Sequence, residues 1–228
     1  MKRFYKQVAI DSGRVLLDGR ALKTPKDTQL VLPTAALADA VADEWRGQGD
    51  EIQPATMPLT RLANAAIDGV APRRAEVVAE IAAFARHDHL CYRAAEPPEL
   101  VRRQIEGWNP LLDWAAERLG ARLKIASGIA SIAQPSETLA ALARAVDACD
   151  PFVLAGLHVA TTITGSLVLG LALAQGRLEV SEAFALSRID ESYQAERWGL
   201  DSEAAARAKK LAAELDAAAR FMDLARNR

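Results

Sequence analysis

The densest group of potential metal ligands in this chain is the run His87, Asp88, His89 and Cys91. If this segment is extended, alternation places His87, His89 and Cys91 on one face, which makes a three-ligand site conceivable. No second pair of ligands follows at finger-like spacing, however, and structural zinc sites normally close with four ligands. The pattern therefore favours the end of a helix running into a loop, and we expect no metal there.

A second group of reactive side chains lies in residues 187–199, SRIDESYQAERWG. On a helix, Ile189 and Tyr193 share one stripe, which predicts that this stripe faces the core. Glu191 and Trp198 are seven residues apart and share another face. The segment therefore combines acidic groups and an aromatic side chain on a helix with one buried side.

Asp190, Gln194 and Arg197 form a further line along the same predicted helix. Three interpretations of this charge pattern stay open. The first is a solvated face whose ion pairs contribute about 0.3 to 0.5 kcal/mol each. The second is an acid/base pair built from the carboxylates, although no ExxH motif is present to support a di-metal site. The third is a recognition surface in which an aromatic anchor is ringed by charges.

Nucleotide-binding loops and a nucleophile elbow are absent from the sequence. There is no GxGxxG and no GxxxxGK followed by Ser or Thr, and Thr164-Gly165-Ser166 lacks the second glycine of an elbow. His158 lies in an apolar segment with no carboxylate or nucleophile nearby in sequence to orient it. We interpret it as a neutral core histidine rather than a base.

The element that must position these groups is segment 151–176, which contains no Asp, Glu, Lys or Arg. A helix of this length could cross a bilayer, which takes roughly 20 apolar residues. Its histidine, threonines and three glycines dilute the apolar content, and its flanks lack aromatic belts and a one-sided Lys/Arg bias. An all-round apolar helix in a chain of average hydropathy is typical of a buried bundle axis. We expect one central helix, covered by the others, and no membrane insertion.

Composition narrows the class of protein. A chain of 228 residues allows one large domain or two small ones. Half of the residues are hydrophobic but only 5% are aromatic, and the abundance of alanine predicts helices. A formal net charge of −2 with interspersed signs indicates no nucleic-acid partner. Two cysteines, Cys91 and Cys149, and an N-terminus without signal or transit character indicate the cytosol.

Strand signals come first along the chain. Short β runs separated by Asp11-Ser12-Gly13 and Asp18-Gly19 predict a small antiparallel sheet, with a fourth run at residues 29–32. Thr34 is predicted to cap a helix that buries Leu37, Val41 and Trp45. We expect an α+β fold with a β-rich N-terminal domain over residues 1–56 and a helical C-terminal domain over residues 57–228.

Helical periodicity continues through the second domain. Helices are predicted after Pro58, after Pro72, over residues 100–119 with a stop at Gly120, after a Ser136 cap, over residues 181–198, and from Asp201 onwards. Segment 122–133 alternates around Ser127-Gly128, which suits a short hairpin.

Several stretches, taken in order, resemble a known family over nearly the whole chain. They are RFYKQV (3–8), LLDGRALKTPKDTQLVLPT (16–34), EW (44–45), MPLTRLANAAID (57–68), DHLCYRA (88–94), Gln104 followed by Trp108-Asn109-Pro110, GSLVLGLAL (165–173) and SRIDESYQAERWG (187–199). In order and spacing they resemble the assembly chaperones of the F1 part of ATP synthase that are specific for the alpha subunit.

The resemblance implies a two-part fold and a non-enzymatic function without a cofactor. Such a chaperone binds newly made alpha subunit and prevents its aggregation, without ATP, until the beta subunit docks. The physical need is clear, because subunits of obligate complexes carry large apolar interfaces that aggregate while they are exposed. The expected compartment is the bacterial cytoplasm, with the mitochondrial matrix for eukaryotic relatives, and we expect a monomer.

By motif position, we assign client contact to Asp190, Glu191 and Glu196, with Trp198 as the anchor. Two competing hypotheses stay open. One is a helical enzyme that uses the clustered carboxylates, with a metal at residues 87–91, and bound metal in the purified protein would support it. The other is a membrane-associated factor that uses segment 151–176, and a need for detergent would support it.

Overall fold

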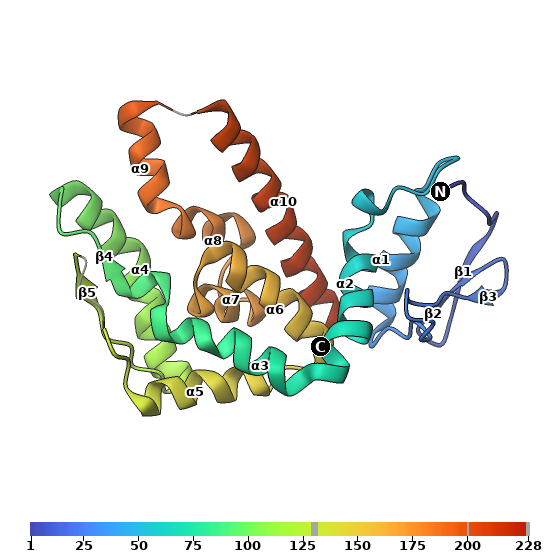
Figure 1. Ribbon diagram of the computed structural model, residues 1–228, viewed down its shortest axis with the longest axis horizontal. Helices are drawn as coiled ribbons and strands as arrows, with labels where there is room; N and C mark the ends of the chain where they lie inside the picture. The colour runs from blue at the N-terminus through green and yellow to red at the C-terminus, as the bar shows by residue number, and fades with distance from the viewer. Residues whose placement is uncertain (129–131, 200, 227–228) are drawn as a thin grey trace.

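A small antiparallel sheet opens the chain and a larger helical domain follows it in the computed structural model, which describes residues 1–128, 132–199 and 201–226 (Figure 1). The sheet has the order β1-β2-β3, with β1 at Val8–Asp11, β2 at Arg14–Leu17 and β3 at Arg20–Ala21. The predicted α+β class is confirmed. The boundary between residues 1–56 and 57–228 stays a prediction.

Two tight turns set the register of the sheet. Ser12 and Gly13 have φ values of 50° and 76°, and Asp18 and Gly19 have φ values of 49° and 81°. Positive φ at both central residues is the type I′ geometry that two-residue hairpins prefer. A Cβ on Gly13 would lie 2.8 Å from the Leu32 carbonyl oxygen, so this turn requires glycine. Both predicted turns are confirmed.

The fourth predicted strand, at residues 29–32, is wrong. The Leu30 N–H donates to the Leu22 carbonyl, whereas the Leu32 N–H donates to the Gly13 carbonyl. Because consecutive bonds go to different partners, only isolated bridges form and no ladder builds up.

Helix α1 (Ala35–Arg46) packs against the sheet. The Thr34 hydroxyl caps it by accepting the Leu37 N–H at 3.1 Å, as predicted. Leu37, Val41 and Trp45 are all buried, so the predicted apolar stripe is confirmed. This stripe and the inward side chains of the sheet form the core of the N-terminal part of the chain.

The remaining helices build the larger domain. They are α2 (Pro58–Ala65), α3 (Arg74–Ala83), α4 (Pro98–Leu119), α5 (Ser136–Asp147), α6 (Pro151–Thr164), α7 (Leu167–Ala174), α8 (Val180–Ser187), α9 (Ile189–Trp198) and α10 (Ser202–Ala225). Short turns join them: η1 (Pro54–Thr56), the π-helical η2 (Ala66–Val70), η3 (Ala71–Arg73), η4 (Phe84–His87) and η5 (His89–Cys91). Gly120 ends α4 in the left-handed conformation, as predicted. Ser136 is the first residue of α5 rather than its cap, since Pro135 holds the cap position.

The prediction of a single central helix over residues 151–176 is wrong, because the segment forms two helices. The prediction that this segment is buried is confirmed. Gly165, at φ 66°, ends α6 in the left-handed conformation. Ser166 then caps α7 by accepting the Leu169 N–H at 3.1 Å. Glycine ends helices and serine starts them, so the chain breaks here. No helix of the described residues has the length and apolarity that crossing a bilayer requires.

Helix α6 is the centre of the domain and packs against α2, α3, α7, α8 and α10. Close approach depends on its glycine. A Cβ on Gly156 would lie 2.4 Å from Met222 Cγ and 3.0 Å from the Ala218 carbonyl oxygen. The small residue therefore lets α6 and α10 meet almost backbone to backbone.

The helix predicted over residues 181–198 is also two helices, α8 and α9. Arg188 between them has φ −125° and ψ 24°, which is not helical. The Trp108 indole N–H donates at 2.8 Å to the Leu186 carbonyl, which a continuous helix would use for the N–H of residue 190. A tertiary contact therefore ends α8.

The predicted hairpin at residues 122–133 is described only in part. Strand β5 (Ala126–Ser127) pairs in parallel with β4 (Tyr92–Arg93), a partner that the sequence pattern did not indicate. Residues 129–131, in the second arm of the predicted hairpin, lie outside the described residues.

Candidate functional site

Helix α9 carries all four residues assigned to client contact, and ion pairs attach it to α4. Nη1 of Arg103 donates to both carboxylate oxygens of Glu196, at 2.9 and 2.8 Å, and its Nη2 donates to Glu99 at 2.9 Å. Arg197 lies 3.5 Å from the other oxygen of Glu99. The pKa of Arg103 is raised mainly by its hydrogen bonds to the Glu196 carboxylate. The pKa of Glu99 is lowered mainly by the hydrogen bond that it accepts from Arg103. The four charges compensate one another at the surface.

Below this network lies the apolar side of α9. The Tyr193 ring is buried, and the guanidinium carbons of Arg103 and Arg197 lie 5.3 and 4.9 Å from its centroid. Such contacts add cation–π attraction to the ion pairs. A Cβ on Gly107 of α4 would lie 3.0 Å from Ile189 Cδ1, so glycine allows the two helices to meet. The predicted inward stripe of Ile189 and Tyr193 is confirmed.

Asp190 also faces α4. Its Oδ1 accepts a hydrogen bond from the Gln104 amide at 2.6 Å, and Gln104 is only 1% exposed. The Gln104 carbonyl oxygen of the side chain accepts the Ala94 N–H at 2.8 Å. Asp190 therefore links α9 to the buried polar groups beneath α4, on a different side from the other acidic residues.

On its other side, α9 faces the N-terminal half of α10 (Figure 1). Residues of both helices line an open groove there. We call it the fork groove; its volume is about 930 Å³, and its lining is provided by residues 184–185, 188, 191–192, 194–196, 198–199, 201, 204–205 and 208. Trp198, 77% exposed, stands at its edge. Ala204, Ala205 and Ala208 present the small apolar face of α10 to it.

The acidic groups of the fork groove already have partners. Glu191 lies 3.5 Å from Nη1 of Arg188, Glu196 is bound by Arg103, and Asp201 caps α10 by accepting the Ala204 N–H at 3.0 Å. The large group left exposed at the groove edge is the Trp198 indole. The groove therefore offers an apolar contact surface with a charged but internally compensated rim.

The structure thus brings Glu191, Glu196 and Trp198 together around the fork groove and places Asp190 elsewhere. The sequence pattern gave no client contact to Phe184, Arg188 or the alanines of α10, although these residues line the groove. The spacing Ala204, Ala205, Ala208 was a usable signal, because it marks one helix face. Alanine is so common in this chain that the face did not stand out.

The alternative metal site at residues 87–91 is not supported by the geometry. His87 Nδ1 lies 3.1 Å from the Tyr92 hydroxyl, whereas the His89 ring packs edge-on against Trp108, with centroids 5.0 Å apart. Cys91 is fully buried, and burial raises the pKa of its thiol to about 12. Within the part of the chain that the structure describes, no three His, Cys, Asp or Glu side chains are grouped to hold a metal ion.

Asp88, in the same run, has a structural position. Its side chain is fully buried and accepts the N–H of Leu90 and of Val168, each at 3.1 Å. Val168 lies in the first turn of α7, so the carboxylate caps that helix from a distant segment. Burial is the main cause that raises the pKa of Asp88, and the hydrogen bonds oppose it. Through these two hydrogen bonds, Asp88 connects the start of α7 to η5.

Known proteins are similar to this chain in fold and in sequence. The chain is similar to the crystal structure of Atp12 from Paracoccus denitrificans, with 47% identity, a TM-score of 0.95, and coverage of 99% of this chain and 98% of the other. It is also 28% identical over 214 residues to the mitochondrial protein atp12 of Schizosaccharomyces pombe, covering 87% of this chain and 74% of that protein.

The sequence model that the chain matches defines a class of chaperones. Residues 2–116 match the sequence model of the family described as ATP12 chaperone protein. The chain belongs to the ATP12 chaperone family.

Proposed function

We propose that this protein is an ATP-independent chaperone that binds unassembled F1 alpha subunit and prevents its aggregation until the beta subunit docks, which promotes assembly of F1 ATP synthase. Membership of the ATP12 chaperone family supports the proposal. The observation that carries it is the fork groove, which an exposed tryptophan lines together with the alanines of α10.

The chemistry of the fork groove suits a client that exposes an apolar interface. Subunits of obligate complexes hide such interfaces only after assembly. Trp198 supplies a large apolar area with one hydrogen-bond donor, and aromatic anchors of this kind dominate binding energy. The alanines of α10 allow close approach without long side chains that lose entropy on binding. A groove of this kind binds by burial and yields when a larger complementary surface competes.

In this proposal the assigned residues have different tasks. Trp198 contacts the client directly, and Glu191 and Glu196 lie at the rim of the contact. Asp190 positions α9 through Gln104 and does not need to touch the client. We further propose the bacterial cytoplasm as the compartment, which agrees with two free cysteines in a reduced state.

The test is suppression of aggregation of purified F1 alpha subunit, measured by light scattering without nucleotide, together with complex formation on a sizing column. Wild type is expected to suppress scattering and to co-elute with the alpha subunit. Trp198→Ser removes the anchor, and Ala208→Glu places an uncompensated charge on the apolar face. Both variants are expected to lose most of the suppression while they keep the fold, because both sites lie at the surface.

Ile125→Ser is the matched control, because Ile125 is an exposed apolar residue, 50% exposed, outside the fork groove. It is expected to behave as wild type. If wild type neither co-elutes with the alpha subunit nor reduces its aggregation, the proposed function is wrong. If wild type works and Trp198→Ser works equally well, the chaperone stands and the fork groove is not its client site.

A further inference from the structure

The β-sheet end of the molecule carries the opposite charge to the helical part. Residues 1–34 contain seven Lys or Arg and three Asp, a formal net charge of +4. Residues 35–228 contain 21 Lys or Arg and 27 Asp or Glu, a formal net charge of −6. Such a division steers segments of different charge to the two ends of the molecule.

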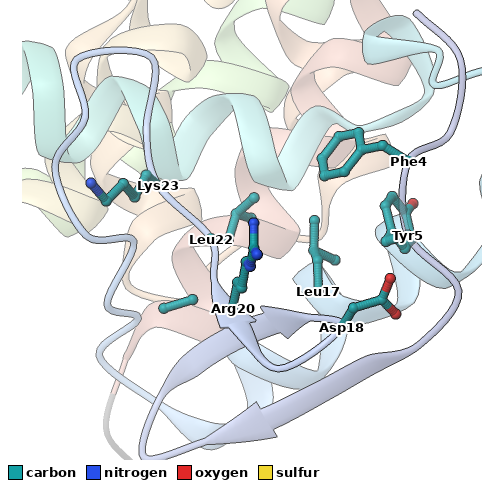
Figure 2. Close-up of a pocket in the computed structure, with 8 residues that line it drawn as sticks. Phe4, Tyr5, Leu17, Asp18, Arg20, Leu22 and Lys23 are labelled. Carbon is teal, nitrogen blue, oxygen red and sulfur yellow. The ribbon is translucent and has the colours of Figure 1, made fainter.

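A hollow of about 550 Å³ opens in this basic region (Figure 2). We call it the sheet groove; residues 4–5, 17–18 and 20–23 line it. Figure 2 shows Phe4 and Tyr5 on one side, Arg20 and Leu22 on the other, and Leu17 between them. The sheet groove shares no lining residue with the fork groove.

One side of the sheet groove carries an aromatic side chain, Phe4, that is largely exposed to water. Tyr5 is buried, and its hydroxyl donates to the Trp45 carbonyl at 2.6 Å. Phe4 beside it is 62% exposed, and its ring is held edge-on against Tyr5 with centroids 5.4 Å apart. A large aromatic side chain that is fixed in place and left in water at the edge of a hollow is typical of a binding surface.

The free charge of the sheet groove is positive. The Asp18 carboxylate is occupied by the backbone N–H of Gln7 at 2.8 Å and of Lys6 at 3.0 Å. These bonds are the main cause that lowers the pKa of Asp18, so it stays ionised and engaged with the backbone. The guanidinium group of Arg20 makes no hydrogen bond or ion pair with any residue that the structure describes. Among the described residues, the Lys23 ammonium group forms an ion pair with the exposed Asp27 alone, and such a surface pair exchanges readily with other partners.

We propose that the sheet groove is a second docking site, which takes an extended acidic segment of the client. An apolar side chain of that segment packs against Phe4 and Leu17, and a neighbouring carboxylate binds the Arg20 guanidinium, whose planar donors match a carboxylate. The identity of the client rests on the proposed function. Because the two grooves lie on different parts of the chain, one client held at both gains affinity by effective concentration.

The first experiment measures the affinity of wild type, Arg20→Glu and Phe4→Ser for purified F1 alpha subunit at about 50 and about 300 mM NaCl. Each substitution is expected to weaken binding roughly tenfold at low salt. The loss caused by Arg20→Glu is expected to shrink at high salt, because screening weakens the charge interaction, whereas the loss caused by Phe4→Ser is expected to persist. Arg118→Glu, the same charge change at an exposed site on α4 outside both grooves, is the control and should bind as wild type.

A second experiment keeps this inference separate from the proposed function. A peptide of about ten residues that alternates Glu with Leu is titrated into the full chain and followed by NMR, beside a peptide that alternates Lys with Leu. Saturable shifts at Phe4, Arg20 and Leu22 with the acidic peptide alone support the inference even if alpha subunit does not bind. Unchanged affinity of Arg20→Glu for an alpha subunit that wild type does bind, with no peptide-induced shifts, overturns the inference and leaves the proposed function intact.

Discussion

The two halves of α10 are both rich in alanine but lie in opposite environments. Towards the C-terminus, Leu215, Ala218, Phe221 and Met222 are buried against α6 and its neighbours. Towards the N-terminus, residues 202–210 contain no buried side chain. The C-terminal half of α10 therefore stabilises the domain through its large apolar side chains, whereas the alanines of the N-terminal half stay at the surface, where we propose that they contact the client.

Helices α9 and α10 also differ in how they are attached. Apolar packing anchors the C-terminal half of α10. Helix α9 combines its apolar stripe of Ile189 and Tyr193 with polar links to α4, which are the Arg103 ion pairs and the bond between Asp190 and Gln104. Substitutions in the packed C-terminal half of α10 and in the helices around it should therefore reduce the free energy of unfolding. Substitutions at the exposed residues of the fork groove should reduce client binding instead. We make five predictions from the structure, in order of decreasing effect.

The largest effect on stability is expected for Gly156→Leu. Its side chain would have to displace Met222 and the backbone of Ala218, which separates α6 from α10. We expect a loss of about 3 kcal/mol, at the upper end of overpacking effects, or failure to fold. Urea unfolding followed by circular dichroism measures it. Gly69→Leu is the control, since a Cβ there meets no atom within 4 Å; a similar loss in that variant would contradict the packing argument.

The next effect is expected for Asp88→Ala. It leaves the N–H groups of Leu90 and Val168 buried without an acceptor, which costs about 2 kcal/mol. The measurement is again urea unfolding. Asp88→Asn, which keeps one acceptor oxygen, is expected to lose less than Asp88→Ala; equal losses would argue against the hydrogen bonds as the cause.

The pH dependence at Asp88 has a definite sign. Because burial raises its folded-state pKa, the folded chain binds more protons than the unfolded chain between the ordinary Asp value and the raised one. Wild type should therefore gain stability relative to Asp88→Asn as the pH falls through that window and lose it as the pH rises. Unfolding both proteins between about pH 4 and pH 7 checks the difference. A difference that does not change with pH would contradict the expectation.

A smaller effect is expected for Asp190→Ala. Removing the acceptor of the Gln104 amide costs about 1 kcal/mol and loosens α9 on α4. Client binding should weaken because α9 is held less firmly in place, but it should not disappear. Glu191→Ala is the comparison, since Glu191 makes only a loose surface pair with Arg188. If Glu191→Ala destabilises the chain more than Asp190→Ala does, the proposal that Asp190 positions α9 is wrong.

The smallest effect on stability is expected for Trp198→Ala, within about 0.5 kcal/mol, because the side chain is mostly in water. The same variant should lose most client binding. Thermal unfolding and the sizing-column assay, run on one preparation, measure both. A stability loss as large as that of Asp190→Ala would mean that Trp198 packs in solution and is not a free anchor.

Local patterns predicted much of this molecule. Paired turn residues predicted the hairpins, Thr34 predicted the start of α1, and the spacing of Ile189 and Tyr193 predicted the buried side of α9. The break at Gly165-Ser166 was also written in the sequence, since glycine ends helices and serine caps them, but the uncharged run around it masked the signal. All of these features depend on neighbours within one or two turns.

Other features were decided by contacts between distant segments. The end of α8 depends on Trp108, 78 positions from the carbonyl it binds, and the pairing of Glu196 depends on Arg103, 93 positions away. No local pattern contains such partners, because they meet only when α4 packs against α8 and α9. The sequence alone determined an α+β chaperone with an uncharged core and an acidic, tryptophan-bearing helix. Only the tertiary structure decided that the acids are already paired and that the fork groove beside them is largely apolar, since pairing depends on distances in space rather than on positions along the chain.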